Sequence, residues 1–353
     1  MFENRNKKRT EIASIGEFGL INKITENIVL KNSSTIKGVG DDAAVIYAEN
    51  KRLLISTDLL IEGVHFDLMF TPLKHLGYKA AVVNFSDIAA MNGVPKQITI
   101  GIAISNRFSV EAIEELYAGI SMACDKYQVD LIGGDTTTSL SGLFISVTVI
   151  GEADENDIVY RNTAKEGDLI CVSGDLGASY MGLQILEREK FVFKNNPEVQ
   201  PDLSGHDYIL ERQLKPEART DIVELFKKLE IKPTSMIDIS DGLASEILHI
   251  CNDSKVGCRL YEEKIPIDIE TIKTAESFKI VPLVCALSGG EDYELLFTIK
   301  LEDFEKVKTL GQIKIIGHIT NADEGINLIT KAEQSIPLTT QGWDSFNSKV
   351  SEN

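Results

Sequence analysis

The sequence predicts a two-domain protein of the α+β, or mixed α/β, class, and three observations support this. The chain has 353 residues, which is more than a single core usually organises. Predicted helices and strands alternate irregularly, unlike the strict strand–helix–strand order of a parallel βαβ fold. A charged stretch of low periodicity with a glycine near each end, residues 151–168, separates two such series. We therefore expect an N-terminal domain over residues 1–156 and a C-terminal domain over residues 157–353.

The predicted N-terminal domain has three helices. Residues 16–29 carry apolar side chains at steps of four, as a short amphipathic helix does. Residues 71–91 are expected to form a helix with Pro72 at its first position. Residues 109–127 begin with Ser109, a favourable N-cap, followed by acidic residues. Strands are predicted at residues 43–48, 52–58, 97–105, 129–135 and 143–153.

The predicted C-terminal domain repeats the mixture of elements in a different order. Strands are expected at residues 169–174, 236–240, 258–263, 294–300 and 313–319. Helices are expected at residues 177–189, 220–231, 240–251 and 302–310. Residues 194–219 are rich in proline, asparagine and charge, and predict a surface excursion.

Composition excludes several classes of function. Lys and Arg total 36 and Asp and Glu total 54, so the net charge of −18 disfavours general binding to nucleic acid or to an anionic membrane. No apolar run is long enough to cross a membrane, and the first residues lack the apolar core of a secretory signal. The five cysteines form no C-x-x-C pair, which disfavours a zinc site and predicts buried thiols in a reducing, cytoplasmic compartment.

Acidic residues recur at places where a predicted strand, helix or glycine turn ends. The segments are "GDD" (40–42), "STD" (56–58), "FSD" (85–87), "GGD" (133–135), "DISD" (238–241) and "GGED" (289–292). Burying ionised carboxylates is costly unless their charge is compensated. Converging oxygen ligands without matched Cys or His suit Mg²⁺, which leaves positions open for phosphate oxygens. The absence of a P-loop and of the protein-kinase motifs means that phosphate would be handled by acids, metal and isolated basic groups such as Arg161.

Each acid also has a purely structural interpretation. Asp87 continues the apolar stripe of the predicted helix 71–91, but could instead mark a solvated helix end or a salt bridge. Asp241 could be a helix N-cap, although Asp238, three residues earlier, weakens that interpretation.

The remaining acidic residues also have structural interpretations that involve no metal. Residues 41–42 could form an Asx turn, which explains one aspartate but not the second. Asp58 and Asp135 could be solvated at strand ends. The recurrence of one local pattern favours the metal hypothesis.

Taken in order, several stretches resemble the thiamine-monophosphate kinase family, of the superfamily that includes aminoimidazole ribonucleotide synthetase and selenophosphate synthetase. They are "GEFGLI", "GVGDDAAVI", "STDLLIEGVHF", "LGYKAAVVNFSDIAAMNGVP", "LIGGDTT", "YRNTAKEGD", "IDISDGLASEI", "ALSGGEDYELLFT" and "GWDSF". Together they span residues 16–346. One departure lies at "MNGVP", with Asn92 and Gly93 where the family usually has Met-Gly-Ala. No motif covers residues 188–219, to which no role is assigned.

The resemblance implies ATP-dependent phosphorylation of thiamine monophosphate to thiamine diphosphate. It also implies an aminoimidazole ribonucleotide synthetase-like fold, a homodimer paired through the N-terminal sheets, and an active site in the cleft between the domains. By motif position, the implied Mg²⁺ ligands are Asp42, Ser56, Thr57, Asp58, Asp87, Asp135, Asp238 and Asp241. Those expected to act in catalysis through bound metal are Asp42, Asp87, Asp135 and Asp241. The implied ATP contacts are Gly134, Asp135, Arg161 and Ser240, and the implied contacts to thiamine monophosphate are His65, Glu291 and Trp343.

Trp343 and Glu291 each also have a purely structural interpretation, and two other functions remain as alternatives. Trp343 could be a buried anchor of the C-terminal segment, and Glu291 could lie in a solvated turn. The acceptor is already a phosphate, so direct in-line transfer needs no general base, only several Mg²⁺ ions that offset the repulsion between two polyanions. The alternatives are another ATP-dependent enzyme of the superfamily and a non-catalytic divalent-cation-binding protein, although no EF-hand loop is present.

Overall fold

The structure, a computed structural model, describes residues 10, 14, 20, 23–37, 45–48 and 51–339. It divides into two units, Met1–Ile88 with Val94–Asp154, and Ala89–Gly93 with Glu155–Asn353. Each unit combines helices with a mostly antiparallel sheet, which confirms the mixed α/β class. Asp41, Asp42 and Trp343 lie outside the described residues, as does part of the predicted helix 16–29.

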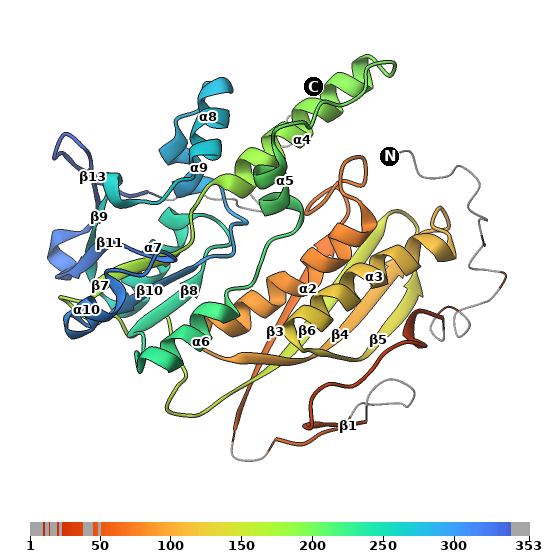
Figure 1. Ribbon diagram of the computed structural model, residues 1–353, viewed down its shortest axis with the longest axis horizontal. Helices are drawn as coiled ribbons and strands as arrows, with labels where there is room; N and C mark the ends of the chain where they lie inside the picture. Colours follow the sequence, from red (N-terminus) through yellow and green to blue (C-terminus); the bar gives the residue numbers. More distant parts are fainter. Residues whose placement is uncertain are drawn as a thin grey trace. The chain divides into compact units, whose positions relative to one another are not determined.

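The first unit is a four-stranded sheet with two long helices over one face (Figure 1). The strand order is β3 (Arg52–Ile61), β6 (Leu143–Ala153), β4 (Val94–Ile104) and β5 (Asp130–Thr138), where only β4 and β5 pair in parallel. The helices are α2 (Leu73–Ala90) and α3 (Val110–Tyr127), and Ser109 caps α3 as predicted. A short ladder joins β1 (Thr35–Lys37) to β2 (Val45–Ile46). Segment 31–35 is fastened to β5 by the buried Asp130, which accepts hydrogen bonds from Asn32 N at 3.0 Å and Thr35 Oγ1 at 2.6 Å.

Helices α2 and α3 cross at two glycines. A Cβ atom added to Gly77 would lie 1.9 Å from the carbonyl oxygen of Leu116, and one added to Gly119 would lie 1.9 Å from that of Lys74. The two backbones are therefore closer than any side chain at these positions would allow.

The second unit is a seven-stranded sheet covered on both faces. Its order is β13 (Ser335–Pro337), β12 (Ile326–Ile329), β9 (Gly257–Tyr261), β11 (Ile313–Thr320), β7 (Leu169–Ser173), β10 (Leu295–Ile299) and β8 (Ser235–Asp238), with only β12 and β9 parallel. The helices are α4 (Ala178–Asn195), α5 (Asp207–Leu214), α6 (Thr220–Leu229), α7 (Leu243–Ser254), α8 (Ile269–Ser277), α9 (Pro282–Ser288) and α10 (Phe304–Val307). In β7, Ile170 and Val172 pack with α7, whereas Cys171 between them packs with α6 on the other face. This explains why the strand is apolar throughout.

Several predicted boundaries were wrong. The predicted surface excursion 194–219 contains α5, whose Ile209 packs into a cluster with Met181 of α4, so a tertiary partner stabilises a helix that local composition disfavours. Helices α8 and α9 were missed, and the helix predicted over residues 302–310 is reduced to α10. Strands β3 and β5 continue past the predicted ends, which places Asp58 and Asp135 inside strands instead of at their ends.

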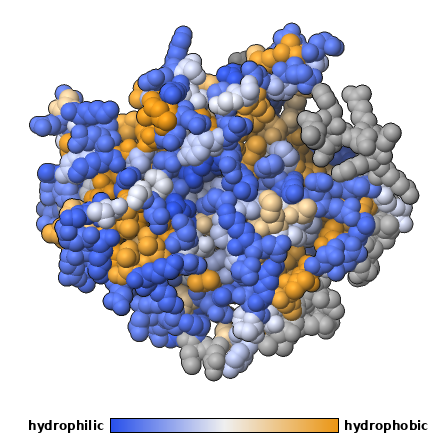
Figure 2. All heavy atoms as spheres, viewed as in Figure 1, coloured by the Kyte–Doolittle hydropathy of each residue, from blue (hydrophilic) through white to orange (hydrophobic). Residues whose placement is uncertain are grey.

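The polarity of the surface and the burial of the cysteine thiols are those that the amino-acid composition predicts. Figure 2 shows polar and charged residues over most of the face in view, with separate apolar patches among them. Within the described ranges, no helix combines the length and the apolar character that a membrane crossing requires. All five cysteines are buried and unpaired, as predicted, and burial raises the pKa of the Cys124 thiol to about 12.

Candidate active site

In the first unit, a serine and two aspartates lie where β3 meets α2. Ser56 and Asp58 point to the same face of β3, because side chains alternate along a strand. That face is the one covered by α2, since the Ser56 hydroxyl donates a 2.5 Å hydrogen bond to Asp87 Oδ2. Asp87 is half-buried within α2, as its place on the apolar stripe predicted.

The negative charge of the Asp58 carboxylate is only partly compensated by neighbouring groups. Burial raises its pKa, and nearby His65 opposes that rise. His65 itself accepts a hydrogen bond at Nδ1 from Ile61 N, at 3.0 Å. Within the part of the chain that the structure describes, the Asp58 carboxylate accepts no hydrogen bond, so a cation beside it would stabilise the ionised form.

Two other residues of the predicted metal set do not join this group. The Thr57 hydroxyl lies on the opposite face of β3, where it donates to the Val147 carbonyl at 2.8 Å and lies 3.0 Å from the Thr148 hydroxyl. Asp135 lies on β5, where it pairs with Gly101 of β4. Strand β5 is three strand spacings, or about 14 Å, from β3. Asp58 and Asp135 therefore lie on the two edge strands of this sheet.

Gly134, next to Asp135, faces the main chain of β4. A Cβ atom at this position would lie 2.0 Å from the Ile100 carbonyl oxygen, so only glycine fits there.

In the second unit, the turn from β8 into α7 carries a second acidic group. Asp238, at the end of β8, is buried, and the N-cap of α7 is Gly242, so the interpretation of Asp241 as the cap was wrong. Asp241 lies one residue earlier, and its main-chain N–H donates to Glu246 Oε1 at 2.9 Å. The Ser240 hydroxyl reaches the same oxygen at 3.4 Å.

Sequence reasoning missed Glu246. Its side chain is 2% exposed, and burial raises its pKa to about 8, with Asp241 and Asp238 adding to the rise. Among the described residues, Oε2 of this carboxylate has no hydrogen-bond partner. An acidic residue in the first turn after "ISD" was the available signal.

A strained loop lies against the same turn. Gly290, Glu291 and Tyr293 have φ angles of 68°, 57° and 52°, a region that non-glycine residues seldom occupy. The loop is held by Glu291 N, which donates to the Ser240 carbonyl at 2.7 Å, and Tyr293 N, which donates to that of Ile239 at 2.9 Å. The Glu291 carboxylate is half-buried and accepts a 3.0 Å hydrogen bond from Gln213 Nε2, so the solvated-turn interpretation of Glu291 was wrong.

Beyond this loop lies a buried ionic network that the sequence did not indicate. Asp292 accepts hydrogen bonds from Gly177 N at 2.7 Å and Ser179 N at 3.4 Å, and so caps α4, whose own N-cap is a glycine. Arg212 pairs with Glu294 at 2.8 Å and lies 3.9 Å from Asp292. Arg and carboxylate groups that are this deeply buried are stable only as a connected set.

Comparison with known proteins identifies the family. The family model described as AIR synthase related protein, N-terminal domain, matches residues 40–153, and its C-terminal counterpart matches residues 165–328. Thiamine-monophosphate kinase from Bacillus subtilis (strain 168) is 34% identical over 94% of this chain and 99% of its own length. The chain belongs to the thiamine-monophosphate kinase family.

Solved structures of the thiamine-monophosphate kinase family share this fold. A structure described as AaThiL complexed with AMPPCP and TMP has a TM-score of 0.73 and 32% identity, and covers 96% of this chain and 99% of its own. The enzyme from Stenotrophomonas maltophilia K279a has a TM-score of 0.76 and 29% identity, over 89% of this chain and 96% of its own. Hydrogenase maturation protein HypE in complex with ATP, at 17% identity and a TM-score of 0.72, shares the fold alone.

In this member of the thiamine-monophosphate kinase family, some predicted residues meet and others do not. In the first unit, Ser56 contacts Asp87. In the second unit, Ser240 and Asp241 both contact Glu246. Arg161 is exposed, with its Nε 3.9 Å from Asp253 Oδ2, and its main-chain carbonyl accepts a 2.7 Å hydrogen bond from Ser235. Over the ranges that the structure describes, no three His, Cys, Asp or Glu side chains form a group that could hold a metal ion.

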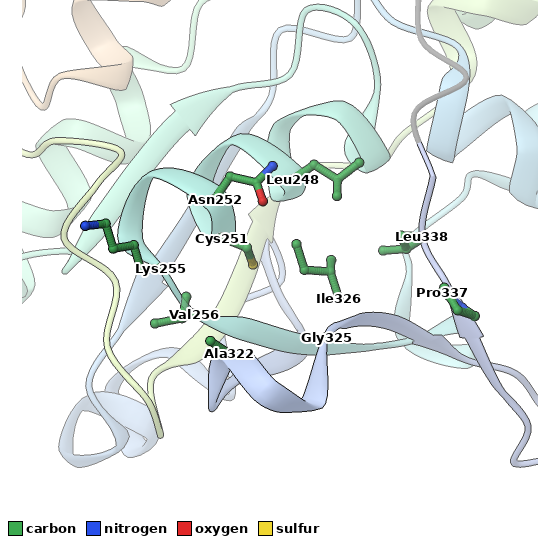
Figure 3. Close-up of a pocket in the computed structure, with 10 residues that line it drawn as sticks. All are labelled: Leu248, Cys251, Asn252, Lys255, Val256, Ala322, Gly325, Ile326, Pro337 and Leu338. Carbon is green, nitrogen blue, oxygen red and sulfur yellow. The ribbon is translucent and has the colours of Figure 1, made fainter.

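A cavity of about 410 Å³ in the second unit contains none of the predicted site residues (Figure 3). It lies beside α7 and the strands β12 and β13. Its lining is mostly apolar, and consists of Leu248, Cys251, Asn252, Lys255, Val256, Ala322, Gly325, Ile326, Pro337 and Leu338.

The buried Asp292 predicts a pH-dependent stability of this thiamine-monophosphate kinase homologue. Burial raises the pKa of Asp292 to about 7, against the opposing charge of Arg212, and Glu294 adds to the rise. The unfolded chain releases this proton near pH 4, so the native state holds more protons between about pH 4 and pH 7. The contribution of Asp292 to the free energy of unfolding should therefore fall by about 2–4 kcal/mol as pH rises through this window.

Urea unfolding at several pH values, for the wild type and for Asp292→Asn, would measure this contribution. The difference between the two curves isolates Asp292, because Asn keeps an acceptor for Gly177 N but cannot ionise. Parallel curves from pH 4 to pH 8 would contradict the prediction.

Proposed function

We propose that this chain catalyses the ATP-dependent phosphorylation of thiamine monophosphate to thiamine diphosphate. The observation that carries the proposal is similarity over nearly the full length of thiamine-monophosphate kinases, at 34% identity to the Bacillus subtilis enzyme. The AaThiL complex with AMPPCP and TMP supports the pairing of a nucleotide with a phosphorylated acceptor.

The proposal includes Mg²⁺, and the donor set of the first unit fits it. Ser56, Asp58 and Asp87 supply only oxygen atoms, and the Asp58 carboxylate is half-buried without a hydrogen bond among the described residues. Bound Mg²⁺ would neutralise the phosphate charges that otherwise keep the two substrates apart. Strand β5, which carries Asp135, lies about 14 Å from strand β3, which carries Asp58, so the proposal includes more than one ion.

Side chains and main-chain groups of the protein would orient the metal ligands and neutralise the charge of the phosphates. The hydroxyl of Ser56 holds the Asp87 carboxylate in one rotamer, while Glu246 holds the main chain before Asp241. The exposed guanidinium of Arg161 is available for the phosphates of ATP, to which Gly134, Asp135 and Ser240 are also assigned. No general base is required, because the acceptor oxygen of thiamine monophosphate is ionised near neutral pH.

The remaining assignments follow the family motifs. Asp42, Asp238 and Asp241 complete the proposed Mg²⁺ set, of which Asp42 lies outside the described residues. Glu291 and His65 are proposed to contact thiamine monophosphate, together with Trp343, which also lies outside the described residues.

The test is an assay with purified protein, ATP and thiamine monophosphate, with and without Mg²⁺. The expected result is equal amounts of ADP and thiamine diphosphate, and no product when the metal is chelated. Turnover only with formylglycinamidine ribonucleotide or selenide would favour a different enzyme of the superfamily. Cation binding without ATP turnover would favour a non-catalytic protein.

We also propose a homodimer that pairs through the sheet of the first unit. On the face of β3 away from α2, Leu53, Ile55 and Leu59 are 44%, 66% and 52% exposed, which is unusual for a row of apolar side chains. Sedimentation velocity should give the mass of a dimer, and Ile55→Glu should shift it to the monomer. Leu301→Glu, at an exposed leucine of the second unit, should leave the dimer intact.

A cytoplasmic location remains part of the proposal. The five unpaired, buried cysteines support a reducing compartment, where such thiols persist.

A further inference from the structure

The turn before helix α7 is held by a glutamate of the helix itself. Glu246, in the first turn of α7, accepts a hydrogen bond at Oε1 from Asp241 N at 2.9 Å, and the Ser240 hydroxyl donates to the same oxygen at 3.4 Å. The N-cap of α7 is Gly242, which has no side chain to cap the helix. Glu246 therefore reaches back past the N-cap, much as the glutamate of a capping box does.

Two further hydrogen bonds hold the same turn from the neighbouring loop. Main-chain N–H groups of residues 290–293 donate to the carbonyls of Ile239 and Ser240, at 2.9 Å and 2.7 Å. Both bonds act on groups that precede Asp241, whereas the bond to Glu246 acts on the N–H of Asp241 itself. The Glu246 bond is therefore the one of the three that most directly fixes the direction of the Asp241 side chain.

The carboxylates of Asp241 and Glu246 are not balanced by a basic side chain of Arg or Lys. His249 of the same helix favours the charge of Asp241, but over the ranges that the structure describes no Arg or Lys pairs with either acid. Glu246 is 2% exposed, and its Oε2 atom has no hydrogen-bond partner among the same residues. A buried acceptor without a donor, next to a second carboxylate, is an environment that a bound cation would stabilise.

We propose that Glu246 is a positioning residue for a divalent cation: its Oε1 atom fixes the main chain at Asp241 and so holds the Asp241 carboxylate in place for the ion. This inference rests on the proposed function, which assigns Asp238 and Asp241 to the Mg²⁺ set. Mg²⁺ demands near-ideal octahedral geometry, so a displaced carboxylate binds it less tightly. Loss of a group that orients a metal ligand typically weakens metal binding by about 10–100-fold.

Two conservative variants separate the reach of Glu246 from its charge. Glu246→Gln keeps the length of the side chain and an oxygen that can accept from Asp241 N, but it has no charge. Glu246→Asp keeps the charge but is one methylene shorter, so it does not reach that N–H. The measurement is a calorimetric titration of the purified protein with Mg²⁺ alone. The Kd should stay within about threefold of the wild-type value in Glu246→Gln and rise about tenfold or more in Glu246→Asp.

The matched control is Glu189→Asp on α4. Glu189 is 8% exposed and accepts a hydrogen bond from Asp202 N at 2.9 Å, so the substitution removes an equivalent bond in a part of the chain to which no metal ligand is assigned. The affinity of this variant for Mg²⁺ should be that of the wild type. A rise in Kd equal to that of Glu246→Asp would show general damage and would overturn the inference.

The ranking of the two Glu246 variants is decisive. If Glu246→Gln binds Mg²⁺ as weakly as Glu246→Asp, or more weakly, the charge matters instead of the position, and the inference is overturned. Unchanged affinity in both variants, or no Mg²⁺ binding by the wild type, would overturn it as well. A wild type that shows the expected ranking but does not phosphorylate thiamine monophosphate would overturn the proposed function and leave the role of Glu246 standing.

Discussion

Asp87→Asn is expected to abolish turnover, with kcat falling by roughly 10³-fold or more, in a protein that stays folded. The Asp87 carboxylate accepts the Ser56 hydrogen bond, and Asn keeps an oxygen that can accept the same bond. What Asn lacks is the negative charge that would hold Mg²⁺, and loss of metal-based charge stabilisation costs several kcal/mol of transition-state energy. Steady-state assays with varied Mg²⁺, combined with circular dichroism and a melting curve, measure both halves of this expectation.

The matched control is Ser56→Ala, which removes the hydrogen bond but keeps the charge of Asp87. It should lower kcat much less than Asp87→Asn does, because it removes one neutral hydroxyl donor and one hydrogen bond but no negative charge. Mg²⁺ alone should raise the melting temperature of the wild type, and less that of Asp87→Asn. Near-normal activity of Asp87→Asn would show that the metal assignment is wrong.

The substitutions Gly77→Ala and Gly119→Ala should each destabilise the first unit, by about 3 kcal/mol. Each new Cβ would lie 1.9 Å from a backbone carbonyl oxygen of the facing helix, and a rigid backbone cannot move aside as a flexible side chain can. Helix α2 would have to shift away from α3, and packing around Leu116 and Lys74 would be lost. The expected fall in melting temperature is roughly 6–12 °C for a unit of this size.

Helix propensity alone predicts the opposite effect, namely that both substitutions increase the stability of the first unit. Alanine is about 1 kcal/mol more favourable than glycine inside a helix, so both variants should be stabilised if the close crossing is absent. Gly311→Ala is the control, because nothing lies within 4 Å of the added atom at that position. Melting curves of the three variants decide between the two accounts, and increased stability of Gly77→Ala would contradict the crossing.

The sequence alone predicted the features that short patterns encode. Helix α3 begins after Ser109 because an N-cap and an apolar stripe are local signals, and β7 was predicted from its apolar run alone. The segment with Asp87 was placed on the buried face of its helix for the same reason, and the spaced motifs indicated the family. Strand lengths were less well predicted, since β3 and β5 continue past residues that look like strand ends.

The tertiary structure alone decided which side chains are partners. Gln213 with Glu291, Arg212 with Glu294, and Gly77 with the carbonyl of Leu116 are separated in the sequence by turns and whole elements. It also showed that Asp58 and Asp135, which look alike in the sequence, lie at opposite edges of one sheet. The physical reason is range: capping and hydrophobic periodicity act within a few residues, whereas burial, ion pairing and close backbone approach depend on neighbours that only folding brings together.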